Sequence, residues 1–309
     1  MTVVTLCGGV GAARFLSGLV RVYEPAEIVA VVNVADDETF HGLHVSPDLD
    51  TVVYTLAGLV DQTRGWGIRA DTFAAEELLA RYGAATWFHL GDRDLATHVR
   101  RTELLRQGLP LSEVTARLAG ALGVGVRILP ATDDPQRTLV RTPEGWLAFQ
   151  EYFVRRGSAD RVLEVRFAGE PRPAPGVLEA IATAEAIIIA PSNPIVSIGP
   201  ILAIPGVREA IRDARAPVVA VSPIVGGVAI KGPAAAMLAG LGHEVSPVGV
   251  AQLYADILDV MVLDEQDASL AARVRAEGVE PMVAPTLMTD AAARERLARV
   301  VLEAAVARA

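Results

Sequence analysis

Short apolar runs alternate with segments of helical period along most of the chain. The runs cover residues 2–7, 28–32, 186–190, 216–221 and 259–263, and polar or glycine-rich residues follow each of them. An apolar run of this length, without alternating polar positions, is typical of a strand that a parallel sheet buries on both faces. The pattern therefore predicts an α/β fold with a doubly wound, mostly parallel sheet.

The pattern changes between about residue 65 and residue 170. Helical segments near 72–82 and from Leu111 onward are interspersed with short apolar segments that indicate strands. These short segments are residues 87–90, 126–129, 138–141, 146–149 and 162–167. We interpret the region as an α+β subdomain inserted into a single domain of residues 1–309, where it covers the substrate or forms a dimer face.

A glycine-rich turn follows the first predicted strand and precedes a helical segment. Gly8, Gly9 and Gly11 let the backbone approach a ligand closely, and the free N–H groups at the start of a helix attract an anion. The turn predicts a phosphate site in a Rossmann-like unit. Arg14 replaces the glycine or alanine of a dinucleotide motif, and no Gly-Lys-Ser/Thr follows, so the turn is neither a standard NAD loop nor a Walker A loop. An NAD site and a purely structural turn remain alternatives.

Two pairs of carboxylates bracket the loop after the second predicted strand. Asp36 and Asp37 come directly after that strand, and Asp48 and Asp50 open a helix that Ser46 is expected to cap. Neighbouring buried carboxylates repel each other unless a cation neutralises them, and oxygen ligands favour Mg²⁺ over zinc. The segment therefore predicts a Mg²⁺ site. The alternative is that these are ordinary loop and first-turn charges.

Three further polar segments follow predicted strands. After residues 87–90, Asp92 is placed to cap a new helix, and Arg93 offers a bidentate donor to a phosphate or a planar ring. Ser192 and Asn193 follow the strand at 186–190, where their polar groups suit a phosphate. Lys231 lies in a Gly/Pro-rich loop and is a candidate phosphate cation. A salt-bridged cap and a surface lysine are the alternatives.

Composition narrows the class of protein. Hydrophobic residues make up 51% of the 309 residues and the mean hydropathy is +0.36, yet no apolar run approaches the roughly 20 residues that span a bilayer. The net charge of −9 gives no general attraction to nucleic acid. A single cysteine, Cys7, excludes an intramolecular disulfide. With no signal-peptide pattern at the N-terminus, we expect a cytoplasmic protein without membrane or nucleic-acid partners.

Seven strings of residues, taken together, resemble the 2-phospho-L-lactate transferase family of coenzyme F-420 biosynthesis. They are residues 8–16, 32–37, 46–56, 91–98, 149–153, 191–194 and 197–202, and they follow one another over nearly the whole chain. The resemblance implies a Mg²⁺-dependent transferase and a homodimer. The reaction it implies moves a phospholactyl or phosphoenolpyruvyl group from a guanosine diphospho donor to the terminal ribityl hydroxyl of the deazaflavin Fo and releases GMP.

The same resemblance assigns roles to residues of this chain. The residues expected at Fo are Asp50, Arg93, Asp94 and His98. The expected Mg²⁺ ligands are Asp37, Asp48 and Asp50. The residues expected to hold the guanosine diphosphate part are Gly8, Gly9, Gly11, Ser192, Asn193 and Lys231. Asp50 and Asp37 are the candidates for the catalytic group that accepts the hydroxyl proton.

A second class of protein shares part of the pattern. Nucleotide-sugar-binding regulators of the gluconeogenesis-factor type have the glycine turn and the Asn-x-x-Asp-Asp element that this chain carries at residues 33–37. They are not expected to carry the string at residues 91–98, so tight binding of Fo would separate the two functions. The valine at position 10 of the turn is more similar to bacterial transferases, which favours the enolpyruvyl donor.

Overall fold

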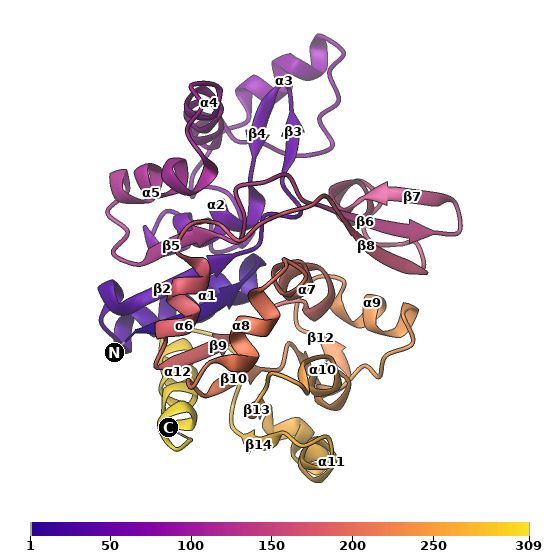
Figure 1. Ribbon diagram of the computed structural model, residues 1–309. Coiled ribbons are helices and arrows are strands. Elements are labelled where there is room, and N and C mark those ends of the chain that lie inside the picture. Colours follow the sequence, from indigo (N-terminus) through magenta and orange to yellow (C-terminus); the bar gives the residue numbers. More distant parts are fainter. Residues whose placement is uncertain (1, 309) are drawn as a thin grey trace.

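The computed structural model describes residues 2–308 as one α/β fold around a seven-stranded parallel sheet (Figure 1). The strand order is β14-β13-β10-β9-β1-β2-β5, and every neighbouring pair is parallel. The strands are β1 (Val3–Cys7), β2 (Ile28–Val32), β5 (Arg127–Pro130), β9 (Ala186–Ile189), β10 (Val218–Val221), β13 (Val260–Leu263) and β14 (Glu280–Val283). The predicted doubly wound α/β fold is thereby confirmed.

The order of the strands reverses direction between β1 and β9. From β1 the chain adds β2 and β5 on one side, and then β9, β10, β13 and β14 on the other. The connections leave the carboxyl ends of β1 and β9 in opposite directions, so a crevice opens between them. Open α/β sheets bind their ligands at this switch point.

Two hydrophobic cores lie on the two faces of the sheet, because alternate strand residues point to opposite sides. Val4 and Leu6 pack into one core, whereas Val3 and Cys7 pack into the other. Cys7 is fully buried, as expected for a core residue. The helices that contribute to the second core are α1 (Gly9–Val22), α2 (Pro47–Leu56), α5 (Leu111–Ala121) and α12 (Ala291–Val306). Those on the opposite face are α6 (Val177–Thr183), α7 (Gly199–Leu202), α8 (Val207–Asp213), α9 (Ala234–Gly240), α10 (Pro247–Tyr254) and α11 (Ala271–Ala276).

Two excursions leave the sheet instead of a single insertion. The first, between β2 and β5, contains the hairpin β3 (Glu38–Phe40) and β4 (Leu43–Val45), then α2, α3 (Ala74–Arg81), α4 (Asp92–Arg106) and α5. The second, between β5 and β9, is a small antiparallel sheet of β7 (Gly145–Ala148), β6 (Arg137–Thr142) and β8 (Glu164–Ala168). Figure 1 shows α3, α4, β3 and β4 at one end of the molecule and the small sheet at its side.

Two sequence predictions in this region are wrong. Residues 126–129 do not belong to an insertion, because β5 pairs with β2 at the edge of the main sheet. Residues 87–90 form no strand. A four-residue apolar segment looks the same in an edge strand, a separate small sheet or a loop, so only its long-range pairing decides between them.

The starts of α3 and α4 exchange their caps. Asp92 was expected to cap α4, but its carboxylate accepts two N–H groups of the first turn of α3, at 3.1 and 2.9 Å. Asp71, which precedes α3, accepts the N–H groups of Arg93 and Asp94 at 2.8 and 3.1 Å and so caps α4. The start of α3 is therefore held by the first residue of α4, and the start of α4 by a residue just before α3.

The remaining elements are short. They are η1 (Pro25–Glu27), η2 (Glu151–Arg155), η3 (Pro194–Ile198), η4 (Glu265–Leu270) and the hairpin β11 (Ile224–Val225) and β12 (Val228–Ala229). Of the helices within residues 2–308, none by itself is long and apolar enough to cross a membrane. One bent pair, Pro194–Leu202 with Val207–Asp213, passes that test of length and composition only when it is taken together across an 83° bend.

Candidate active site

A cavity of about 630 Å³ lies at the carboxyl edge of the sheet, over the switch point. Its walls come from the turn after β1, the first turns of α2 and α4, the loop after β9 and the loop before α9. Of the residues expected at the site, it is lined by Gly8, Gly9, Gly11, Asp48, Asp50, Asp94, His98, Ser192, Asn193 and Lys231. The fold thus brings together on one surface residues that are far apart in the sequence, from Gly8 to Lys231.

The glycine turn is built against the loop after β9. Gly9 has a φ of +69°, which glycine adopts without strain. A side chain on Gly8 would place its Cβ 2.5 Å from the Cβ of Ser197, and one on Gly11 would overlap the carbonyl oxygen of Pro191. The Ser192 hydroxyl donates to the Gly8 carbonyl oxygen at 2.9 Å. The glycines therefore permit a close backbone approach between the two sides of the crevice.

Asn193 has a structural contact in this arrangement. Its Oδ1 accepts the N–H of Ile195 at 2.9 Å, so the side chain caps η3 instead of pointing freely at a ligand. Like Ser192, it still lines the cavity. Either residue can contact a phosphate there only in addition to the bonds that hold the loop.

Asp36 and Asp48 share one amide group on the floor of the cavity. Asn33 Nδ2 donates to Asp36 Oδ1 at 3.1 Å and to Asp48 Oδ2 at 3.0 Å. Burial raises the pKa of Asp36 well above its usual range, and the charge of Asp48 adds to the effect. Burial also raises the pKa of Asp48 to about 7, against the opposing bonds from Asn33 and the Gly9 N–H. We call Asn33, Asp36 and Asp48 the carboxylate floor.

Asp37, an expected Mg²⁺ ligand and catalytic candidate, lies outside the lining of the cavity. Its Oδ2 accepts the Ser46 hydroxyl at 2.6 Å and lies 2.9 Å from His44 Nε2. Ser46 precedes α2 as expected, but its hydroxyl serves Asp37 and does not cap the helix. No group of three His, Cys, Asp or Glu side chains among residues 2–308 is gathered as a metal site. Asp36, which shares the Asn33 amide with Asp48, lines the cavity in place of Asp37.

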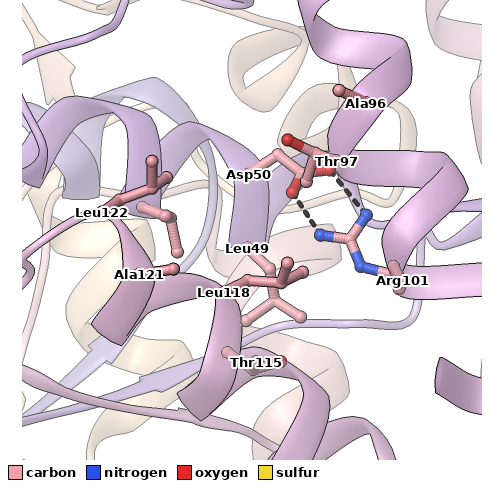
Figure 2. A pocket seen from close by; sticks show the side chains of 10 residues that line it. Leu49, Asp50, Ala96, Thr97, Arg101, Thr115, Leu118, Ala121 and Leu122 are labelled. Carbon is pink, nitrogen blue, oxygen red and sulfur yellow. Dashed lines mark hydrogen bonds and ion pairs between the residues drawn. The ribbon is translucent and has the colours of Figure 1, made fainter.

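Asp50 is held from behind by an arginine that sequence reasoning missed. Arg101 Nη1 donates to Asp50 Oδ2 at 3.0 Å, and Nη2 donates to Asp50 Oδ1. Only 3% of the Arg101 side chain and 8% of the Asp50 side chain are exposed. Figure 2 shows the guanidinium turned toward the carboxylate, with both interactions drawn. A buried pair of this kind depends on both partners, because either charge alone would be costly.

The same arginine contacts His98, which connects Asp50 to Asp94. Arg101 Nη1 lies 3.3 Å from His98 Nδ1, and His98 Nε2 lies 3.1 Å from Asp94 Oδ1. The Tyr54 hydroxyl donates to Asp94 Oδ1 at 2.7 Å. Burial raises the pKa of Tyr54, so its phenol keeps the proton that it donates. We call Asp50, Arg101, His98, Asp94 and Tyr54 the Arg101 network.

A helical spacing could have identified this network. Asp94, His98 and Arg101 occupy positions i, i+4 and i+7 of α4, so they share one helix face. All three are buried, although α4 is polar along most of its length. A buried stripe of charged residues on a polar helix indicates a site rather than a core.

Cationic side chains also line the cavity. They come from Arg14, Arg64 and Lys231. Lys231 Nζ donates to the Arg64 carbonyl oxygen at 3.0 Å, and burial together with the charge of Arg14 lowers the pKa of Lys231. Arg93, expected at Fo, is exposed, does not line the cavity and donates to the Arg69 carbonyl oxygen at 3.3 Å. The cavity therefore has an acidic floor and a basic wall, which suits a ligand bearing both a metal ion and phosphate.

A smaller pocket of about 200 Å³ lies between α2, α4 and α5 (Figure 2). Its wall is mostly aliphatic, with Leu49, Val53 and Leu118 among its residues, and Asp50 and Arg101 complete it. Asp50 also lines the large cavity. Both residues of the Asp50–Arg101 pair thus line the small pocket, and Asp50 alone also lines the large cavity.

A family model and curated relatives agree on one family. The family model described as 2-phospho-L-lactate transferase CofD matches residues 3–306. A protein of Streptomyces coelicolor named phosphoenolpyruvate transferase is 47% identical over 98% of this chain and 97% of its own length. A protein of Methanosarcina mazei named 2-phospho-L-lactate transferase is 41% identical over 96% of this chain and 98% of its own. A crystal structure of a UPF0052 family member from Bacillus halodurans has a TM-score of 0.69 over 97% of this chain and 98% of its own, at 18% identity, which compares the fold alone.

Proposed function

The chain belongs to the 2-phospho-L-lactate transferase family, and we propose that it transfers a phospholactyl or phosphoenolpyruvyl group from a guanosine diphospho donor to the deazaflavin Fo in coenzyme F-420 biosynthesis. The observation that carries the proposal is the cavity over the switch point, with its carboxylate floor and basic wall. Phosphoryl-type transfer depends mainly on positioning and on charge neutralisation, and this cavity offers groups for both.

The donor fits the half of the cavity around the glycine turn. The N–H groups at the start of α1 and the cations Arg14 and Lys231 suit its diphosphate. Asp48 also lies beside the Gly9 N–H, and an ionised Asp48 would repel a phosphate at that position. A cation between the carboxylate and the phosphate removes this conflict.

Magnesium is the cation that we propose. Asp36 and Asp48 are hard oxygen donors with raised pKa values, and the bonds that they share come from a neutral amide. This donor set fits Mg²⁺, with Asp36 and Asp48 as the residues that would hold it. When bound, Mg²⁺ would neutralise charge on the diphosphate. Asp37 and Asp50 were also expected as ligands, but they are already engaged, by Ser46 and His44 and by Arg101 respectively.

The acceptor fits the half of the cavity around α4. Asp50, Asp94 and His98 offer polar contacts to a ribityl chain there. The aromatic side chains of Trp66, Phe88, Phe149 and Phe153 also line the cavity and suit the flat ring of a deazaflavin.

The transfer then proceeds by displacement at phosphorus. The terminal ribityl oxygen bonds to the phosphorus that carries the three-carbon acid, and the bond from that phosphorus to the bridging oxygen of GMP breaks. The hydroxyl proton passes to Asp50 or Asp94, the two carboxylates that line this half of the cavity.

Between the two three-carbon acids, we favour enolpyruvate. Five actinobacterial relatives named phosphoenolpyruvate transferase are 43–47% identical to this chain, whereas three archaeal relatives named 2-phospho-L-lactate transferase are 39–41% identical. The difference in identity is small, but every relative with the first name is more similar to this chain than every relative with the second. It agrees with the bacterial form of the glycine turn.

Mass spectrometry would test the proposal directly. The purified protein is incubated with Fo, Mg²⁺ and both guanosine diphospho donors, and the Fo adduct is weighed. A dehydro adduct is expected, and a saturated adduct would name lactate instead. A control without Mg²⁺ should give no adduct. If no adduct forms and Fo does not bind, the regulatory alternative replaces the transferase.

A further inference from the structure

We propose that Arg101 is a positioning residue of the transfer, which fixes the orientation of Asp50 and the tautomer of His98 without touching the substrates. The inference rests on the proposed function, because it concerns the half of the cavity that receives the acceptor. Neither the resemblance nor the motif strings point to Arg101, since it lies beyond the string at residues 91–98.

The contact with Asp50 fixes a plane as well as a position. Both terminal nitrogens of Arg101 donate to Asp50, one to each carboxylate oxygen. Two parallel bonds from a planar guanidinium hold a carboxylate in one orientation, which a single bond from an ammonium group does not. Each oxygen keeps a further lone pair, so Asp50 can still accept a hydrogen bond from a ligand in the cavity that it lines.

The contact with His98 selects one tautomer. A guanidinium only donates hydrogen bonds, so His98 Nδ1, which lies 3.3 Å from Arg101 Nη1, must carry the lone pair. In the neutral ring the proton is then on Nε2, which lies 3.1 Å from Asp94 Oδ1 but makes no hydrogen bond there. Arg101 thereby leaves the N–H of the imidazole on the ring edge beside Asp94, the second carboxylate of the acceptor half.

Arg101 reaches the large cavity through these two neighbours. It does not line the large cavity, whereas Asp50 and His98 both do. The small pocket of about 200 Å³ adjoins its side chain, so packing alone does not immobilise the guanidinium. Its hydrogen bonds therefore define its position. A side chain at position 101 that makes fewer hydrogen bonds should free both the Asp50 carboxylate and the His98 ring to move.

Arg101→Lys tests the proposal, because it keeps the charge and loses the fork. Arg100→Lys is the matched control, since Arg100 is the adjacent residue of α4 and pairs with Glu103 at the surface. We expect Arg101→Lys to lower kcat by about 100-fold, because a misplaced reacting group slows the chemical step. The KM for the donor should stay within about twofold, because the donor binds in the other half of the cavity. The control should behave as wild type in both.

Nitrogen NMR of the His98 ring supplies a readout that a purely structural role would not move. Wild type and Arg100→Lys should show the Nε2–H tautomer, and Arg101→Lys should show a mixture of both tautomers. Urea unfolding of each variant separates a loss of folded protein from a loss of positioning. As a second variant, Arg101→Ala should regain part of its turnover when guanidinium chloride is added below the concentration that unfolds it.

Several outcomes would overturn the proposal. They are a wild-type His98 in the Nδ1–H tautomer, an Arg101→Lys enzyme with kcat within about twofold of wild type, or a fall in kcat that matches the fall in folded protein with the tautomer unchanged. A wild-type protein that turns over neither donor overturns the proposed function instead. The tautomer is measured without substrates, so the two failures are distinguishable.

Discussion

The cavity is lined by two pairs of aspartates, Asp36 with Asp48 and Asp50 with Asp94. All four are about equally buried, with 6–7% of each residue exposed. Their neighbours differ. The first pair shares the neutral amide of Asn33, whereas the second pair is linked through Arg101 and His98, and Tyr54 donates to Asp94. Burial raises the pKa of both acids of the first pair. The first pair therefore needs a proton or an added cation, whereas in the second pair Asp50 already has its counter-charge in Arg101.

This difference assigns separate tasks to carboxylates that look alike in the sequence. A pair without its own cation is a suitable place for an exchangeable one, which arrives and leaves with the donor. A pair with a resident arginine is preorganised and keeps its geometry whether or not a substrate is bound. Replacing one member of each pair should accordingly have different effects on stability.

The largest effect is expected from Asp50→Asn. Turnover should fall by at least roughly 1,000-fold, because the variant removes a charged group from the acceptor half of the cavity. The free energy of unfolding should also fall by about 3 kcal/mol, because the buried Arg101 charge loses its partner. Steady-state kinetics and urea unfolding measure the two losses. Near-normal turnover would remove Asp50 from the site.

Asp48→Asn should separate activity from stability. Turnover is expected to fall by about 100-fold, because the carboxylate floor loses a charge for Mg²⁺. The free energy of unfolding should stay the same or rise, since the amide oxygen can still accept the bonds from Asn33 and Gly9 and a repulsive charge is gone. A marked loss of stability would show that Asp48 is also paired within the protein, and the contrast with Asp50 would fail.

The carboxylate floor should also make stability depend on pH. The pKa of Asp48 is about 7 in the folded protein and near 4 in an unfolded chain, so between these values the folded state binds more protons. The contribution of Asp48 to stability is then greatest below about pH 4 and falls as the pH rises toward 7, with a slope of up to about 1.4 kcal/mol per pH unit.

Urea unfolding in metal-free buffer at several pH values would measure this slope. Asp48→Asn should flatten it. Added Mg²⁺ should raise the stability most near pH 7, where the carboxylates are ionised. A slope that is the same in the wild type and in Asp48→Asn would contradict the raised pKa of Asp48.

The smallest effect is expected from Arg93→Ala. Arg93 is exposed and lies outside the lining of the cavity, so its contact with Fo would be made near the rim. The Kd for Fo should rise by about tenfold, while the Kd for GDP stays unchanged, and calorimetry measures both. Equal losses of the two affinities would argue against the placement of Arg93 at Fo.

Local patterns predicted the fold well, and they predicted which segments form the site. The strands at residues 2–7 and 28–32 are apolar throughout because both faces are buried, and the glycine turn follows directly from the need for close approach. These features are encoded within a few neighbouring residues. The edge strand β5 was misplaced because its partner, β2, lies about 100 residues away in the chain.

The choice between neighbouring side chains could not be predicted. Asp36 and Asp37 are adjacent, and Asn33 and Ser46, which come from different elements, decide which of them faces the cavity. Arg101 was missed for the same reason, since its partner Asp50 lies on another helix. Mg²⁺ dependence, the Fo acceptor and the homodimer stay predictions.

The exchanged caps of α3 and α4 have a consequence for how the acceptor half assembles. Asp71 completes the start of α4 and Asp92 completes the start of α3, so neither helix end is satisfied until both segments are in place. The two helices therefore form one cooperative unit, which should gain and lose protection from hydrogen exchange together. Asp94 and His98 lie in the first two turns of α4. The part of the acceptor half that α4 supplies should therefore become ordered together with α3.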